Sequence, residues 1–145
     1  MKRGDCELCQ GDGGAVLWRD ARLRVVAVDD PGIPAFLRVV WNGHVREMTD
    51  LAQPDAAHLL DTVLAAERAL RAVLQPDKIN IASLGNAVPH LHWHVIPRYA
   101  GDAHFPQPVW GVRQREPDPA VLARQRAALP QLRAALAATL PVAQG

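Results

Sequence analysis

The chain has 145 residues, of which 49% are hydrophobic and 21% are charged, and its formal net charge is +1. This length suits one domain with a single core, and the composition is that of an ordinary globular protein. The balanced charge argues against a dedicated nucleic-acid-binding protein, and no apolar run is long enough to cross a membrane. No secretory signal is visible at the start, so a cytoplasmic location is expected.

The first half of the chain is predicted to form three short strands and one long helix. The strands are expected over 15–19, 23–28 and 36–41, with a turn at 29–34 that contains two prolines and a glycine. The segment 54–74 has apolar residues at helical spacing and a proline in its first turn, which suits the start of a helix. This helix is expected to pack on the sheet or on a second subunit.

The second half is predicted to add two strands and a helical segment. The strands are expected over 78–84 and 90–98, with a tight connection at 85–89. An irregular segment follows, and residues 120–140 then have helical character. Pro130 must kink or split this helix, because proline lacks an amide donor and clashes with the preceding turn.

Strands on both sides of one long helix indicate an α+β fold. We therefore predict a mainly antiparallel five-stranded sheet, one long packed helix and a C-terminal helical segment. Residues 1–116 are assigned to the main domain, and residues 117–145 to a helical extension of that domain.

Three of the six histidines alternate with apolar residues in the run His90-Leu91-His92-Trp93-His94-Val95-Ile96-Pro97. Alternate side chains of a strand share a face, so His90, His92 and His94 are predicted to line a cleft while their neighbours enter the core. Imidazole exchanges protons near neutral pH and can attack phosphorus. The alternatives are three unrelated surface histidines, or one metal shared by all three. A shared metal is disfavoured, because three alternate strand residues span about 13 Å at roughly 3.3 Å per residue.

The histidine run resembles the signature of the histidine triad (HIT) family, in which three histidines alternate with apolar residues and Pro-Arg follows. The resemblance also covers residues 23–44, the helix from Pro54 and residues 78–98. It implies a nucleotide-binding α+β fold, commonly a homodimer, that needs no cofactor. It also implies attack on the α-phosphate of a nucleotide conjugate, such as a dinucleoside polyphosphate or a nucleoside phosphoramidate. The expected partner is a purine nucleotide or its conjugate, with no nucleic acid or membrane.

The resemblance implies a role for each histidine of the run. His92, the middle member, matches the nucleophile that forms a covalent nucleotidyl-histidine. The backbone carbonyl near His90 would orient the ring of His92 by accepting from its other nitrogen. His94 matches the residue that contacts phosphate oxygens or the leaving group. Splitting one displacement into two steps is the usual benefit of such covalent catalysis.

Further residues match substrate-binding positions of the family. Asn86 matches a phosphate-contacting amide, and His44 matches a fourth family histidine at the end of a strand. Asp29 and Asp30 lie where the family places a ribose-binding polar residue, since a carboxylate accepts from both hydroxyls. A turn acid and a surface histidine are the plain alternatives. Ala87 stands where many members have a hydroxyl residue, which leaves the preference for a leaving group open.

The two cysteines form Cys6-Glu7-Leu8-Cys9, a spacing that suggests metal binding or redox chemistry more than a disulfide in a cytosolic chain. It resembles the zinc half-site of some HIT members, whose other ligands correspond to His44 and His90. Such a Cys₂His₂ set would be a structural zinc site that leaves His92 free. A metal-free pair of thiols is the alternative.

Two other functions stay open from the sequence: a non-catalytic nucleotide-binding module and a zinc-dependent metalloprotein. The segment His104-Phe105-Pro106-Gln107-Pro108-Val109-Trp110 leaves a similar choice. His104 and Trp110 either border the site, because such segments shape substrate choice in the family, or Trp110 simply anchors an irregular segment on the core.

Overall fold

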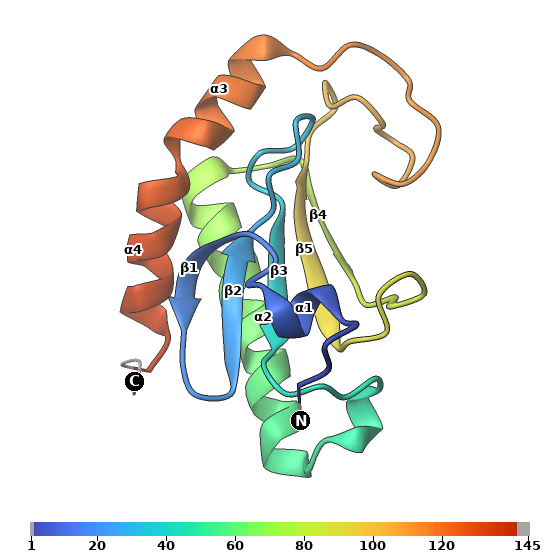
Figure 1. Cartoon of the computed structure of the whole chain (residues 1–145). Helices are drawn as coiled ribbons and strands as arrows, with labels where there is room; N and C mark the ends of the chain where they lie inside the picture. Colours follow the sequence, from blue (N-terminus) through green and yellow to red (C-terminus); the bar gives the residue numbers. More distant parts are fainter. Residues whose placement is uncertain (1, 142–145) are drawn as a thin grey trace.

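The computed structural model describes residues 2–141, and five antiparallel strands form its central sheet (Figure 1). The strands lie in the order β1-β2-β3-β5-β4, which confirms the predicted α+β class. In chain order the elements are α1 (Glu7–Gln10), β1 (Ala15–Arg19), β2 (Leu23–Ala27), β3 (Leu37–Trp41), a 3-10 turn (Met48–Asp50), α2 (Gln53–Leu74), β4 (Lys78–Ala82), β5 (His92–Arg98), α3 (Pro119–Ala127) and α4 (Leu129–Thr139).

Most predicted elements are confirmed, with boundaries that differ by one or two residues. The C-terminal helical segment is split before Pro130, into α3 and α4, as the proline requires. The prediction that the last strand begins at His90 is wrong, because β5 begins at His92. The amide of Leu91 donates to the carbonyl of Val45, which lies beyond the end of β3, so the chain here pairs with a loop.

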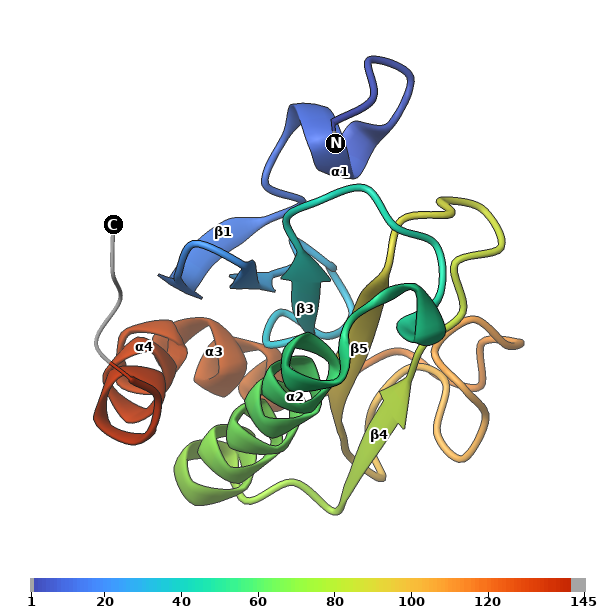
Figure 2. The same ribbon diagram turned by 90° about the horizontal axis from the view of Figure 1, so that it is seen from below.

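Helices cover the two faces of the sheet unequally. Figure 2 shows α1 on one face and α2, α3 and α4 on the other. The main core lies between the sheet and the larger helical layer, where burial of apolar surface supplies the main stabilisation. Its larger fully buried members are Leu23, Val25, Leu37, Val39 and Val95 of the sheet, Leu59, Leu70 and Leu74 of α2, and Leu132 and Leu136 of α4. Within residues 2–141 no helix has the length and apolar character needed to span a membrane.

The opposite face of the sheet carries two smaller apolar clusters. One cluster joins Cys6, Leu8 and Cys9 of the N-terminal segment to Val26 and Val40 of the sheet. The other consists of Ile33, Phe36 and Ile96, with Val28 and Val109 packed against it. The polar side chains of the histidine run lie between these clusters, so this thinly covered face is where a ligand can approach.

Arg24 fixes the N-terminal segment over this face. Its side chain is buried, and its guanidinium donates to the carbonyls of Leu8 at 2.7 Å, Gly11 at 3.0 Å and Asp12 at 2.8 Å. It also donates to Oδ1 of Asn42 at 2.9 Å, in the loop after β3. Because a buried charge must be paired or hydrogen-bonded, Arg24 couples α1 to the sheet. The two cysteines are thereby held at a defined position.

Candidate active site

His92 and His94 lie side by side on the thinly covered face of β5. In the antiparallel register His92 is opposite Val40 and His94 is opposite Arg38, both on β3. Residues directly opposite each other in a sheet share a face, so these side chains form one group. The two imidazole rings have centroids 4.9 Å apart, and both histidines are buried as residues.

The ring of His92 is held in one tautomer. Its Nδ1 lies 2.5 Å from the backbone carbonyl of His90, which can only accept, so Nδ1 carries the proton. This is the hydrogen bond that the family resemblance implies. Nε2 of His92 then keeps its lone pair. It does not belong to the fully buried side-chain nitrogens without a hydrogen-bond partner. Burial lowers the pKa of His92 and so favours the neutral, nucleophilic form.

His90 lies outside the strand that carries the other two histidines, and its buried ring points to the cysteine cluster on the same face of the sheet, so it does not line an open cleft as predicted. It precedes β5, it is fully buried, and its Nε2 donates to the carbonyl of Trp41 at 2.6 Å. Its Nδ1, with a free lone pair, faces Cys6 Sγ at 3.3 Å and Cys9 Sγ at 3.5 Å. The carbonyl of Leu91 still accepts from the amide of Trp41 on β3, but the amide of Leu91 donates to Val45 instead, so the regular ladder ends here. The backbone of His90 therefore serves His92, while its side chain serves the cysteines.

The structure brings together all four predicted metal ligands. Ligand atoms of Cys6, Cys9, His44 and His90 lie within 4.8 Å of one another, and Cys9 Sγ is 3.4 Å from Nδ1 of His44. In tetrahedral zinc with bonds of about 2.0–2.3 Å, neighbouring ligand atoms are roughly 3.3–3.8 Å apart. The Cys–His separations of 3.3–3.5 Å fall in that interval. The carbonyl of Trp41 accepts from Nε2 of His90 and thereby leaves the Nδ1 lone pair of His90 free for a metal. The donor set therefore fits zinc.

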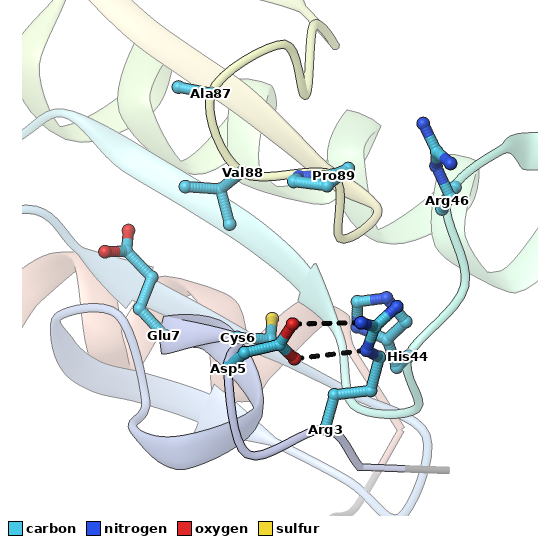
Figure 3. A pocket seen from close by; sticks show the side chains of 9 residues that line it. All are labelled: Arg3, Asp5, Cys6, Glu7, His44, Arg46, Ala87, Val88 and Pro89. Carbon is cyan, nitrogen blue, oxygen red and sulfur yellow. Dashed lines mark hydrogen bonds and ion pairs between the residues drawn. The ribbon is translucent and has the colours of Figure 1, made fainter.

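His44 and Cys6 also line a cavity of about 280 Å³ with the loop that precedes β5 (Figure 3). The exposed pair Arg3–Asp5 lies at its mouth, with a nitrogen–oxygen distance of 2.9 Å. Since His44 faces Cys9 and this cavity, the interpretation of His44 as an isolated surface histidine is wrong. In the described part of the chain, the residues close enough to hold a metal together are Cys6, Cys9, His44 and His90. His92 and His94 are not among them, so the structure does not support a metal shared by the three histidines of the run.

His94 is enclosed by two aromatic rings. The centroids of Phe36 and Trp110 lie 5.4 Å and 5.0 Å from its own, both in edge-to-face geometry. Burial, with the positive charges of His92 and Arg38 in addition, lowers the pKa of His94 from 6.5 to about 4. Trp110 is 53% exposed, so it borders the site rather than anchoring its segment in the core.

The segment that carries Trp110 is positioned by a buried ion pair. Arg98, the last residue of β5, donates to both carboxylate oxygens of Asp102 at 2.8 and 3.0 Å. Asp102 also accepts from the amides of Tyr99, His104 and Phe105. Although burial opposes it, these hydrogen bonds and the charge of Arg98 lower the pKa of Asp102. The carboxylate thereby folds residues 99–105 into a turn, beyond which the chain returns toward His94.

The remaining predicted residues lie at the margins. Oδ1 of Asp30 accepts from the amides of Gly32 at 2.8 Å and Ile33 at 2.9 Å, so this oxygen stabilises the turn. Asp29 is exposed, and no side-chain hydrogen bond involves it within the described chain. Asn86 is exposed on the loop before β5 and does not contact His92 or His94 through any hydrogen bond that the structure shows for residues 2–141.

Sequence reasoning missed Arg38, which faces His94 from the middle of β3. A signal was present: a single arginine interrupts the apolar run Phe36-Leu37-Arg38-Val39-Val40 at a position that shares a face with Phe36 and Val40. A charged residue at the centre of a strand in the middle of a sheet requires a partner or a ligand.

Comparison with known proteins agrees with this arrangement. A family model described as the HIT domain matches residues 13–101. The chain belongs to the HIT family. A solved histidine triad protein from Bradyrhizobium japonicum is 32% identical to it, with a TM-score of 0.72 over 86% of this chain and 92% of that one. A histidine triad protein from Marinobacter aquaeolei is 28% identical, with a TM-score of 0.75 over 97% and 100%.

Two curated relatives of this HIT chain have names that state an activity. An AP-4-A phosphorylase of Mycobacterium tuberculosis is 35% identical over 81 residues, which are 52% of this chain and 42% of that protein. A bis(5'-adenosyl)-triphosphatase of Saccharomyces cerevisiae is 35% identical over 75 residues, or 48% and 36%. The match thus spans less than half the length of these relatives. A zinc-bound HIT protein of Mycobacterium smegmatis is 28% identical, with a TM-score of 0.63 over 92% and 94%.

Proposed function

We propose that this protein is a nucleotide hydrolase or nucleotidyl transferase that attacks the α-phosphate of a nucleotide conjugate through His92. The observation that carries the proposal is the hydrogen bond from Nδ1 of His92 to the carbonyl of His90. It leaves the Nε2 lone pair on a face where His94 and two aromatic rings form the surroundings. The activities named for the two curated relatives support an adenosine conjugate as substrate.

The chemistry proceeds in two displacements. Nε2 of His92 attacks the α-phosphorus, a phosphorus–nitrogen bond forms, and the bond to the leaving group breaks with its electron pair. His92 is then a nucleotidyl-imidazolium, whose remaining Nδ1 proton is held by the carbonyl of His90. Water or another acceptor attacks the same phosphorus, loses a proton, and displaces His92 with release of the nucleotide. Each step is an in-line substitution at phosphorus, and the covalent intermediate divides one difficult step into two.

The nucleoside is proposed to lie over the cluster of Ile33, Phe36 and Ile96, where the partly buried Val28 and Val109 provide an apolar surface for a base. Of the two acids before Pro31, Asp29 is the better ribose ligand, because Oδ1 of Asp30 is already engaged by two amides. Val26 of β2 packs on the cysteine cluster and is not part of this surface. Asn86 remains a proposed phosphate ligand, which requires the loop before β5 to bend toward His92.

We further propose that Cys6, Cys9, His44 and His90 bind one zinc ion, as supported by their geometry and by the zinc-bound relative. All four coordination positions would be filled by protein, so the metal stabilises the N-terminal segment and takes no part in the reaction. By holding the ring of His90, it also keeps the His90 carbonyl in place beneath His92.

A homodimer is proposed through the edge strand β4 and the outer face of α2. Leu60 and Leu64 of α2 are 41% and 42% exposed, Ile81 of β4 is 38% exposed, and Leu84, in the loop after β4, is 55% exposed. An unpaired sheet edge with exposed apolar groups is a liability unless it is covered. A two-fold axis would cover both edges by pairing the same surface of two copies.

The decisive test of the function is a panel of conjugates. Purified protein is incubated with diadenosine tri- and tetraphosphate, their guanosine counterparts and adenosine 5′-phosphoramidate, and the released mononucleotide is identified by mass. Release of the nucleoside monophosphate is expected from wild-type protein and not from His92→Asn. Tight binding of nucleotides without turnover of any conjugate would contradict the enzymatic proposal and favour a binding module.

A further inference from the structure

Three buried or half-buried arginines project from the thinly covered face of the sheet, and two of them have obvious structural partners. Arg24 binds backbone carbonyls of the N-terminal segment, and Arg98 binds the carboxylate of Asp102. Arg38 is the third, at the centre of β3 and directly opposite His94. It accordingly lies beside the histidines, whereas the other two lie toward the edges of the group.

Arg38 has no protein acceptor within residues 2–141. Its Nε is buried without any hydrogen-bond partner, and no carboxylate lies within ion-pair distance of its guanidinium among these residues. Glu7 of α1 is the acid whose charge reaches it, and this charge only partly offsets the burial that lowers the pKa of Arg38. A half-buried guanidinium that lacks an acceptor is costly for the fold, so a structural role does not explain it.

A second unsatisfied nitrogen lies across the strand pair. Nδ1 of His94 is also buried without a partner in the described chain. Residues opposite each other in an antiparallel pair have Cβ atoms about 5 Å apart, so the side chains of Arg38 and His94 are neighbours on this face. A ligand with several oxygen atoms and negative charge satisfies the guanidinium, and it also satisfies Nδ1 of His94 in the tautomer that carries the proton on that nitrogen. Phosphate is such a ligand, and the planar guanidinium binds it through two parallel hydrogen bonds.

We propose that Arg38 binds phosphate oxygens of the substrate's leaving group and makes the site prefer nucleotide conjugates that leave as a phosphate chain over those that leave as an amine. This inference rests on the proposed function of His92. When the bond to a phosphate leaving group breaks, that group gains negative charge, and a fixed cation beside it stabilises the transition state more than the ground state. An amine leaving group gains no such charge. Ala87 leaves the preference for a leaving group open, and in this proposal Arg38 of β3 determines that preference.

The test compares two substrates that share the adenylyl group. The value of kcat/KM is measured with diadenosine tetraphosphate and with adenosine 5′-phosphoramidate, for wild type and Arg38→Gln. Arg38→Gln is expected to lower kcat/KM about 100-fold or more for the polyphosphate, the usual effect of losing one charge-stabilising donor, and less than about 5-fold for the phosphoramidate. Equal losses on both substrates, or no loss on either, would overturn the assignment.

Two further variants serve as controls for this comparison. Arg22→Gln removes the same charge from an exposed arginine that pairs with Asp55 and lies far from the histidines in the sheet, so both activities should stay at the wild-type level. Arg38→Leu matches the apolar neighbours on β3 and replaces Arg38→Gln if that variant does not fold. Arg38→Leu must show the same selective loss, because leucine, like glutamine, carries no charge.

A binding measurement separates failure of this inference from failure of the proposed function. If wild type turns over neither substrate, the proposed function fails, and Arg38 is then tested by calorimetry with ADP and with adenosine. Arg38→Gln is expected to weaken ADP binding about tenfold or more and to leave adenosine binding unchanged. Parallel changes for both ligands, or none, would show that Arg38 does not bind phosphate.

Discussion

Acidification is predicted to destabilise the folded protein through His94. Burial keeps the pKa of this imidazole at about 4, whereas the unfolded chain has the ordinary value of 6.5. Between these two values the unfolded state binds a proton that the folded state does not, so the free energy of unfolding falls as the pH falls. The contribution is fully present above about pH 6.5 and is lost by about pH 4. At 1.36 kcal/mol per pH unit the whole interval corresponds to about 3 kcal/mol.

The assay is urea unfolding of wild type and His94→Gln at pH 7.5 and pH 4.5, with chelator in both cases so that metal loss does not contribute. Glutamine is polar but does not titrate, and subtraction of the two proteins cancels the titration of the histidines that do not contact His94. The stability difference between wild type and variant should shift by roughly 2–3 kcal/mol in favour of the variant at pH 4.5. A difference that is the same at both pH values would refute the reasoning that His94 is held neutral by its surroundings.

Three further predictions concern metal, assembly and the N-terminal segment. Purified protein should carry close to one zinc per chain, and chelation should lower Tm more than it lowers activity. A protein that contains no zinc by elemental analysis and whose Tm does not change with chelator would contradict the site. Light scattering should give a dimer mass, and Leu64→Glu should shift it toward a monomer, whereas a wild-type monomer at micromolar concentration would refute the interface. Arg24→Ala should cost roughly 3 kcal/mol in the free energy of unfolding and reduce zinc affinity, because four hydrogen bonds to buried or partly buried groups disappear; unchanged stability in a urea titration would show that α1 is held without it.

The order and type of the elements could be predicted because local patterns determine them. Proline fixed the start of α2 and the break before α4, and apolar alternation marked the strands. The start of β5 could not be predicted, because the alternation of histidines continues through His90 while the backbone of Leu91 pairs with Val45, far away in sequence. A pattern of alternating residues reports side-chain faces and not hydrogen-bond partners.

The candidate site divides in the same way. The row of histidines and the cysteine pair could be proposed from residue type and spacing, whereas the choice of His92 as the nucleophile came from the resemblance to the HIT family. The partner of Arg38 across the sheet could not, because the register between β3 and β5 depends on the connection through α2 and β4. The contact of Trp110 with His94 likewise depends on the turn that Asp102 builds. No local signal in either segment reports these distant pairings.

The central claim is that His92 is the nucleophile, and the most direct measurement is capture of its covalent intermediate. Wild-type protein is mixed with diadenosine tetraphosphate, quenched in alkali during turnover, digested, and examined by mass spectrometry. One adenylyl group is expected on the peptide that contains His92 and on the His92 residue itself. The variant His92→Asn should carry no adduct and should lose about a thousandfold or more in kcat. Release of mononucleotide by His92→Asn within a few-fold of the wild-type rate, with no adduct on the wild-type peptide, would contradict the account.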